Sequence, residues 1–336
     1  MRKTTGFLAA VAAVSAIALG GGGTPAQPFT MKLSSPVANE VSHEWMKAFK
    51  AGVEARAGGR MKVELYPANQ LGQIPATVEG VAMGTIEFAV PAIGFFIGLE
   101  PRFQTLDAPG LFDSMENAEK VFQDPDIRAR LATFGQDKGI EPLITFVNSP
   151  LGLLSHKAVR KVSDFQGQKI RVPGGAPMHV EPFRKLGALP VSMPLGEVMP
   201  AMQNRAVDGL IAGIAVYTTA KYYDVAKALT YLPSSFLVAS GAVNRRFMAS
   251  LGSDLEKIVR EEAKKHEELF WTWGVEDVKR IQATWAKNGG ESIVLPPAEA
   301  KAYLDLATSV IPQIVGSNPK LKEDYDALVA AAKKYR

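Results

Sequence analysis

The order of extended and helical patterns in residues 29–90 constrains the fold more than any other feature of the sequence. Short apolar runs with the spacing of strands alternate with amphipathic runs with the spacing of helices. The predicted elements are a strand at 29–33, a helix that carries Trp45, Ala48, Phe49 and Val53 and ends at Gly58 and Gly59, a strand at 61–66, a helix at 74–83 and a strand at 86–90. Because a helix separates each pair of strands, we expect crossover connections and a largely parallel sheet.

A second stretch, later in the chain, has a similar order of elements. Its predicted elements are a strand at 170–172, a helix at 180–186, a helix at 197–203 and a strand at 207–211. A chain of 336 residues also exceeds the usual size of a single hydrophobic core. The sequence therefore predicts an α/β protein of two lobes, built on mixed, mostly parallel sheets.

A long helical pattern follows the second stretch. Ser253 can cap its start, and apolar residues recur at helical spacing as far as Trp285. Unbroken, this helix would measure roughly 50 Å at 1.5 Å per residue, which is longer than one small lobe is wide. We expect it to lie across both lobes, and Gly274 is the position where it could break or bend. Residues 297–336 are also mostly helical, with an interruption at 317–319.

The first 26 residues have the order of a secretory signal peptide. Arg2 and Lys3 precede an uncharged apolar run at 6–19, and small and turn residues continue to Ala26. The apolar run is shorter than the roughly 18 to 20 residues of a membrane-spanning helix, so a permanent anchor is the weaker alternative. We expect cleavage after Ala26 and a mature protein in the periplasm. The chain contains no cysteine, so lipid attachment, disulfides and thiolate metal sites are not expected.

Composition and motifs argue against several classes of function. The predicted leader holds two of the 38 Lys and Arg residues, which leaves 36 against 34 acidic residues and no sign of a nucleic-acid surface. The sequence contains no P-loop, G-x-S-x-G or H-E-x-x-H motif, and no G-x-G-x-x-G after the predicted leader. His43 and His266 lie in predicted surface helices, which favours solvated or capping roles for them. His156 and His179 fall in predicted loops and are the better candidates to lie near a ligand. We therefore expect no enzyme, no cofactor and no metal site.

The loop at 92–98 follows the third predicted strand and carries two adjacent aromatic residues, Phe95 and Phe96. By default, such an apolar loop packs beneath its lobe. In open parallel sheets, however, ligands bind beyond the carboxyl ends of the strands, and this loop falls there. Two interpretations stay open: both rings belong to the core, or one of them contacts a ligand.

Five blocks of the sequence, in order, resemble those of DctP-type solute-binding proteins, which serve tripartite ATP-independent periplasmic (TRAP) transporters. The blocks lie at 58–72, 81–87, 108–112, 164–172 and 197–209. The first, GGRMKVELYPANQLG, resembles the family's GGR, strand and PxxQLG pattern, and the fourth, DFQGQKIRV, is similar to DLkGlKIRv. No single block is specific, but their common order supports the resemblance.

This resemblance implies a two-lobed periplasmic binding protein fold that closes like a hinge around a small organic carboxylate. The closed protein would then dock on the TRAP membrane permease subunits. The expected division is a leader at 1–26, lobe I at 27–148 plus about 237–270, and lobe II at 149–236 plus about 271–336 with the C-terminal helices.

The resemblance also implies site residues. An arginine in the family's KIR strand forms a two-pronged salt bridge to the solute carboxylate, and Arg171 occupies this position. Many relatives carry a second arginine where this chain has Pro150, and often an asparagine where it has Ala212. The loss of both polar contacts argues for a smaller or more apolar monocarboxylate. Asn148 and Tyr217 are then the expected hydrogen-bonding partners, beside Phe95 or Phe96.

Two alternatives to a TRAP binding protein remain. The chain could feed another transport or sensory system, which its neighbouring genes would reveal. A periplasmic enzyme on a similar fold is less favoured, because it would have to act without cysteine, a recognisable triad or a metal cluster.

Overall fold

The computed structural model describes residues 27–336. The predicted signal peptide and its cleavage site therefore lie outside the described residues. Within that range, none of the helices has both the length and the apolar character needed to cross a membrane.

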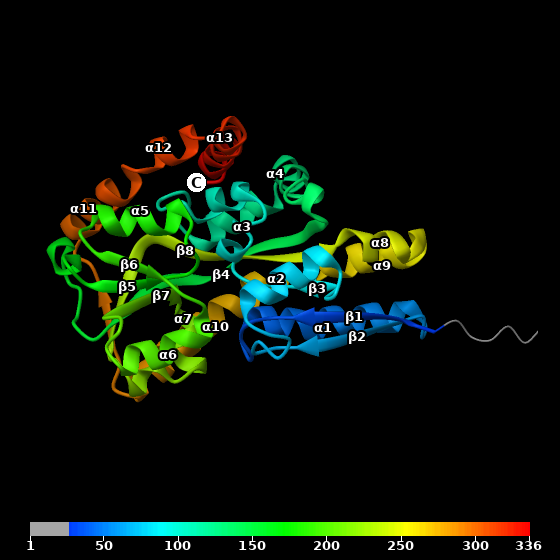
Figure 1. The fold of residues 1–336 in the computed structure, drawn as a ribbon, viewed down its shortest axis with the longest axis horizontal. Helices are drawn as coiled ribbons and strands as arrows, with labels where there is room; N and C mark the ends of the chain where they lie inside the picture. The colour runs from blue at the N-terminus through cyan, green and yellow to red at the C-terminus, as the bar shows by residue number, and fades with distance from the viewer. Residues whose placement is uncertain (1–26) are drawn as a thin grey trace, which may run out of the picture.

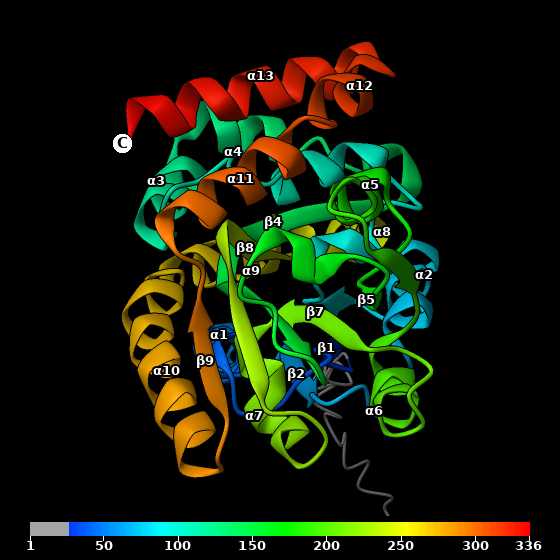
Figure 2. The same ribbon diagram turned by 90° about the vertical axis from the view of Figure 1, so that its left-hand side faces the viewer.

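The described strands form one continuous mixed sheet of nine strands (Figures 1 and 2). Their order is β2-β1-β3-β8-β4-β7-β5-β6, with β9 beside β8. The strands are β1 (Phe29–Ser34), β2 (Met61–Tyr66), β3 (Phe88–Ala89), β4 (Ile140–Ser155), β5 (Lys169–Val172), β6 (Leu189–Ser192), β7 (Gly209–Gly213), β8 (Ala228–Asn244) and β9 (Glu291–Val294). Pairings at both ends of the sheet are parallel, whereas β3, β7 and β4 pair antiparallel with the long central strands. The predicted α/β class with a mixed, mostly parallel arrangement is confirmed.

The helices cover both faces of this sheet (Figure 2). They are α1 (Val41–Ala57), α2 (Ile74–Met83), α3 (Met115–Gln123), α4 (Pro125–Leu131), α5 (Pro177–Lys185), α6 (Leu195–Gln203), α7 (Ile214–Thr219), α8 (Arg245–Ser250), α9 (Gly252–Lys265), α10 (Glu268–Lys287), α11 (Pro297–Thr308), α12 (Ile311–Gly316) and α13 (Pro319–Lys334), with 3₁₀ helices η1 (Ile93–Phe95), η2 (Pro101–Asp107), η3 (Gln136–Lys138), η4 (Val162–Phe165) and η5 (Tyr222–Asp224). The Gly-Gly pair predicted to close α1 does so, since Gly58 and Gly59 have φ of 57° and 82°. Strand β7 begins two residues later than predicted because the N–H groups of Ala206 and Val207 bond to the carbonyl of Ala201 at the end of α6.

Two long antiparallel strands, β4 and β8, join the two ends of the molecule (Figure 1). We call the end with β1, β2, β3, α1, α2, η2, α3 and α4 lobe I, and the end with β5, β6, β7, β9, α5, α6 and α7 lobe II. The register of β4 against β8 shifts between Val147 and Ser149 and again between Pro150 and Gly152. Such shifts bend a strand, and proline, which lacks an N–H group, is tolerated there. The bend lies where β4 leaves lobe I and begins to pair with β7 of lobe II.

The predicted long helix is present as α9 and α10, which a turn at His266 and Glu267 separates. The interruption does not fall at Gly274, where a break or bend was left open, because Gly274 is buried inside α10. The side chains at the turn are engaged elsewhere: His266 bonds to Glu262, and Glu267 pairs with Arg128 on α4. Helix α10 packs against α1 in lobe I and against α7 and β9 in lobe II, so it spans both lobes as expected.

The C-terminal helices divide between the lobes. Helix α11 packs on α5 and β8, but α13 packs on η2, α3 and α4, which are elements of lobe I (Figure 2). The expected division places residues 271–336 with lobe II, and we propose that α13 belongs to lobe I instead. The physical reason is its apolar face, on which Leu321 and Leu328 join the buried cluster that contains Phe103, Val121 and Ile127.

Asp124 ties α13 to lobe I. One oxygen of its carboxylate caps α4 by accepting from Asp126 N and Ile127 N, and the other accepts from Lys334 Nζ and Tyr335 Oη, both at 2.8 Å. Lys334, together with these hydrogen bonds, lowers the pKa of Asp124 to about 2. The contact therefore stabilises the fold fully above the ordinary aspartate pKa and loses its effect as the pH falls through about 2.

We expect Asp124→Asn to lower the free energy of unfolding by about 1 kcal/mol at pH 7, a modest value because the Lys334 side chain is exposed. Urea denaturation at a series of pH values measures this difference, which should shrink below pH 4 and disappear near pH 2. Asp137→Asn, at an exposed position beside Lys138, is the control and should change stability by less than about 0.5 kcal/mol. A difference in unfolding free energy that stays constant down to pH 2 would show that the ionised Asp124 carboxylate does not stabilise the contact with α13.

Candidate functional site

A cavity of about 600 Å³ lies between the lobes, which we call the inner cavity. Lobe I contributes the turn before α1 and the residues that follow β3, and lobe II contributes the ends of β5 and β7 and the first turn of α7. The crossing strands β4 and β8 supply Asn148, Leu237 and Ala239. An outer groove of about 1220 Å³ shares Pro36, Val37 and other lining residues with it, so the inner cavity lies at the bottom of the interlobe cleft.

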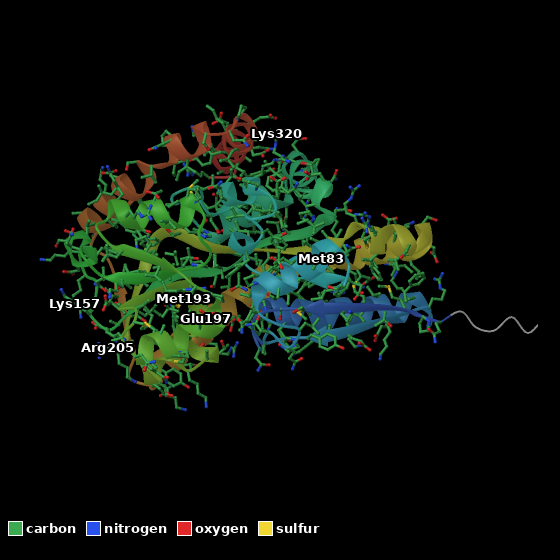
Figure 3. The ribbon with its side chains drawn as sticks, viewed as in Figure 1. Met83, Lys157, Met193, Glu197, Arg205 and Lys320 are labelled. Carbon is green, nitrogen blue, oxygen red and sulfur yellow. The ribbon has the colours of Figure 1, made fainter. Side chains whose placement is uncertain are left out.

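Among residues 27–336, Arg171 is the one cationic side chain that lines the inner cavity. It stands on β5 and is only 1% exposed. Its Nε donates to the carbonyl of Met193 at 3.0 Å and its Nη1 to the carbonyl of Ile211 at 3.1 Å, which fixes the plane of the guanidinium. Met193 is labelled in Figure 3, close to Glu197 on α6. Neither of these bonds uses Nη2.

No carboxylate of the described residues neutralises Arg171. Burial lowers the pKa of its guanidinium to about 10, which is still well above neutral pH. The guanidinium therefore keeps its charge at neutral pH. A buried charge without a counter-charge is costly, and such a charge is normally retained where an anion can approach. The planar fork of arginine suits the two oxygens of a carboxylate.

Glu40 is a second ionisable group on the cavity wall, and the sequence did not single it out. It is 3% exposed and caps α1: its Oε2 accepts from Ser42 N at 3.0 Å, and its Oε1 accepts from His43 N at 3.2 Å. Its Oε2 also accepts from Asn148 Nδ2 at 2.7 Å. Burial raises the pKa of Glu40, and these hydrogen bonds oppose that rise. Sequence reasoning had no signal for it, because glutamate is not among the residues preferred at a helix N-cap.

Four of the predicted site residues line the inner cavity: Arg171, Asn148, Ala212 and Phe95. Of the adjacent aromatic residues, Phe95 therefore faces the cavity, whereas Phe96 is in the core and stacks on Phe103 with ring centroids 5.0 Å apart.

The other two predicted residues, Pro150 and Tyr217, are not among the lining residues. Pro150 lies in β4 opposite Phe236 of β8. Tyr217 is fully buried, and burial raises its pKa. Its hydroxyl accepts from Ala212 N at 2.9 Å and reaches the carbonyls of Gly152 at 2.7 Å and Leu210 at 3.0 Å. Tyr217 thus joins α7 to β4 and β7.

We expect Tyr217→Phe to lower the free energy of unfolding by about 1 to 3 kcal/mol, because it leaves buried backbone groups without their partner. The affinity for a solute should change by less than about threefold. Chemical denaturation and calorimetry measure the two quantities, with Tyr231→Phe as control, since the Tyr231 hydroxyl bonds only to the side chain of Gln282. Unchanged stability together with lost binding would restore the predicted ligand role of Tyr217.

The histidines lie outside the inner cavity. His43 Nδ1 accepts from Asn39 N at 3.0 Å and His266 bonds to Glu262, as expected of capping roles. His179 joins the lobes, since its Nε2 lies 2.5 Å from Asp107 Oδ2 on η2. Within residues 27–336, no group of histidine and acidic side chains could hold a metal ion.

Another hollow, of about 380 Å³, lies between α3, β4 and α10. Its one arginine, Arg128, already pairs with Glu267. Burial, with neighbouring carboxylates, raises the pKa of Glu119 in this hollow to about 7. With its cation neutralised, this hollow is less suited to an anion than the inner cavity.

Residues 34–317 match the model of the DctP family, described as bacterial extracellular solute-binding protein, family 7. The chain belongs to the DctP family. A TRAP periplasmic solute-binding protein from Shewanella oneidensis, with bound succinate, has the same fold, with a TM-score of 0.84 and 25% identity over 91% of this chain and 99% of that chain. The predicted family and two-lobed binding-protein fold are thereby confirmed.

Two curated relatives of this DctP family chain are named as periplasmic binding proteins. The 2,3-diketo-L-gulonate-binding protein YiaO of Escherichia coli (strain K12) is 27% identical over 78% of this chain and 79% of that protein. The C4-dicarboxylate-binding protein DctP of Shewanella loihica is 26% identical over 70% of each chain. The chain is thus a TRAP-type solute-binding protein and not an enzyme, as expected.

Proposed function

We propose that this protein captures a small organic monocarboxylate in the inner cavity and delivers it to the membrane subunits of a TRAP permease. The observation that carries the proposal is the buried Arg171, a charged guanidinium whose plane is fixed and which no carboxylate of the described residues neutralises. The bound succinate of the Shewanella oneidensis protein and the names of the two curated relatives support a carboxylate as the solute.

Three features of the inner cavity favour a small solute with a single carboxylate. Arg171 is the only cation among the lining residues that the structure describes, so a second carboxylate would have no partner there. Apolar side chains such as Ile74, Leu195 and Val216 form most of the wall. Glu40, when ionised, repels a second negative charge and so acts against dicarboxylates.

We further propose that the protein works in the periplasm and that the lobes close on the solute. The predicted leader at 1–26 and the periplasmic relatives support the location. Contacts across the cleft support closure: His179 meets Asp107, and Arg280 Nη2 donates to the carbonyl of Asn39 at 3.3 Å. The bend in β4 near Asn148 is the proposed hinge.

A thermal-shift screen against organic acids tests the solute class. At a concentration of about 100 times the Kd, a ligand adds about 2.7 kcal/mol, which raises Tm by roughly 4 °C for a chain of this size. We expect such shifts with small monocarboxylates and smaller ones with dicarboxylates of equal length. The monocarboxylate assignment fails if dicarboxylates give the larger shifts, and the carboxylate assignment fails if no acid gives one. Two membrane-subunit genes beside the gene would favour a TRAP permease over another transport or sensory system.

A further inference from the structure

The contacts of Asn148 indicate a specificity of the inner cavity beyond carboxylate capture. Asn148 stands on the crossing strand β4 and lines the inner cavity, as do Glu40 from lobe I and Arg171 from lobe II. An asparagine side chain has a donor end and an acceptor end, and its neighbours decide which end faces a solute.

Glu40 and Ser42 occupy the donor end of Asn148. The Nδ2 atom donates to Glu40 Oε2 at 2.7 Å and to Ser42 Oγ at 3.2 Å. The same Oε2 accepts from Ser42 N and from Ser42 Oγ, so it acts as an acceptor towards all of its partners. An acceptor at this point requires the nitrogen of the amide to face Glu40, and the amide orientation is thereby fixed.

The acceptor end of Asn148 faces another part of the cavity wall. A Cβ atom placed on Gly213 would lie 3.4 Å from Asn148 Oδ1, and Gly213 itself lines the inner cavity. Among the described residues, no side chain or backbone group donates to this Oδ1, whereas Nδ2 has two acceptors. The cavity therefore offers a cation at Arg171 and an oriented carbonyl oxygen at Asn148.

We propose that the solute is a monocarboxylate that also carries a hydrogen-bond donor, either a hydroxyl or a protonated amine, which Asn148 Oδ1 accepts. Glu40 is the positioning residue that holds the amide in this orientation. The proposal rests on the proposed function, because it takes the carboxylate at Arg171 as given. An oxo group in place of the donor would set its oxygen against Asn148 Oδ1 and is disfavoured.

Matched acids of one carbon skeleton test the proposal by calorimetry. The probes are propionate, lactate, alanine and pyruvate, followed by the same four forms of longer acids. We expect a donor-bearing form to bind at least about tenfold more tightly than the oxo form, because a buried acceptor without a donor costs about a factor of ten or more. The hydroxy and amino arms distinguish the two kinds of donor.

Two variants probe the orientation of the amide. In Glu40→Gln, the new side-chain amide can donate to Asn148 Oδ1, so the Asn148 amide can turn and present Nδ2 to the cavity. The side-chain oxygen that remains at position 40 still caps α1. The preference for donor over oxo acids should then fall to within about threefold or reverse. Asn148→Leu should lose the preference while carboxylate binding persists.

Glu100→Gln is the matched control, because Glu100 also caps a helix, η2, through Arg102 N and reaches Gly135 N, away from the inner cavity. Its ratio of donor to oxo affinities should stay that of the wild type. Equal affinities for the four wild-type probes, or a wild-type ratio in folded Glu40→Gln and Asn148→Leu, would overturn the inference and leave carboxylate capture intact. Absence of binding by every acid would overturn both.

Discussion

Arg171→Ala is expected to weaken binding of the best acid from the screen by at least about 10-fold to 100-fold. A charged hydrogen bond contributes about 1.5 to 3 kcal/mol, and a two-pronged pair contributes more. Pro150 and Ala212 offer no charged replacement, and within the described part of the chain Arg171 is the only cation that lines the inner cavity. Calorimetry with the purified protein measures the change.

Arg171→Lys separates shape from charge. Lysine keeps the positive charge but cannot reproduce the planar fork or the two bonds that Arg171 makes to the carbonyls of Met193 and Ile211. We therefore expect this variant to bind poorly too. An affinity close to that of the wild type would mean that general electrostatic attraction is sufficient.

Arg171→Met controls for folding. It removes a buried charge that no carboxylate of residues 27–336 neutralises, and the methionine side chain fills much of the same space. Replacing buried charge with apolar volume is often neutral or stabilising, but Arg171→Met also removes the donors to the carbonyls of Met193 and Ile211, so the stability of the solute-free protein should stay within about 1 to 3 kcal/mol of the wild type. If a folded alanine variant bound the acid within about threefold of wild type, a difference of roughly 0.7 kcal/mol, the carboxylate clamp would be excluded.

Local patterns sufficed for the features that a few neighbouring residues determine. The spacing of apolar residues identified α1 and β2, and the Gly-Gly pair between them identified the helix end. Arg171 was identified because its strand carries a recognisable block of sequence, and the structure places it on the cavity wall. In each case the decisive signal lies within a short stretch of chain.

Features that depend on distant partners were not predicted. Glu40 matters to the cavity because it bonds to Asn148, and 108 positions separate the two residues. Tyr217 was expected to bond the solute, but its ring points back to Gly152 on β4, 65 positions earlier. Helix α13 docks on lobe I because of a cluster that includes Phe103 and Val121, far from it in sequence. Periodicity shows which face of an element is apolar, but not what covers it.

Gly213 is a further case, because no sequence pattern singles it out. It ends β7 on the wall of the inner cavity, where the crossing strands β4 and β8 approach. A Cβ atom at this position would lie 2.5 Å from Ser149 Oγ and 2.8 Å from Leu237 Cδ2. Real Cβ contacts are longer than this, so an added methyl group must displace the side chains of both strands.

We expect Gly213→Ala to lower the free energy of unfolding by about 1 to 3 kcal/mol and to weaken solute binding by at least about tenfold. Leu237 lines the inner cavity, so its displacement changes the surface that the solute contacts. Gly98→Ala is the control, because a Cβ atom there meets nothing within 4 Å, and both quantities should stay near those of the wild type. Chemical denaturation and calorimetry measure them.

The double variant Ser149→Ala with Gly213→Ala decides whether the close approach is the cause. Ser149 Oγ is buried and has no hydrogen-bond partner among the described residues, so its removal alone should cost little. In the double variant one of the two collisions is gone, and part of the lost stability and affinity should return, with a coupling of about 0.5 kcal/mol or more. Strictly additive effects would show that Gly213 is required for a reason other than its contact with Ser149.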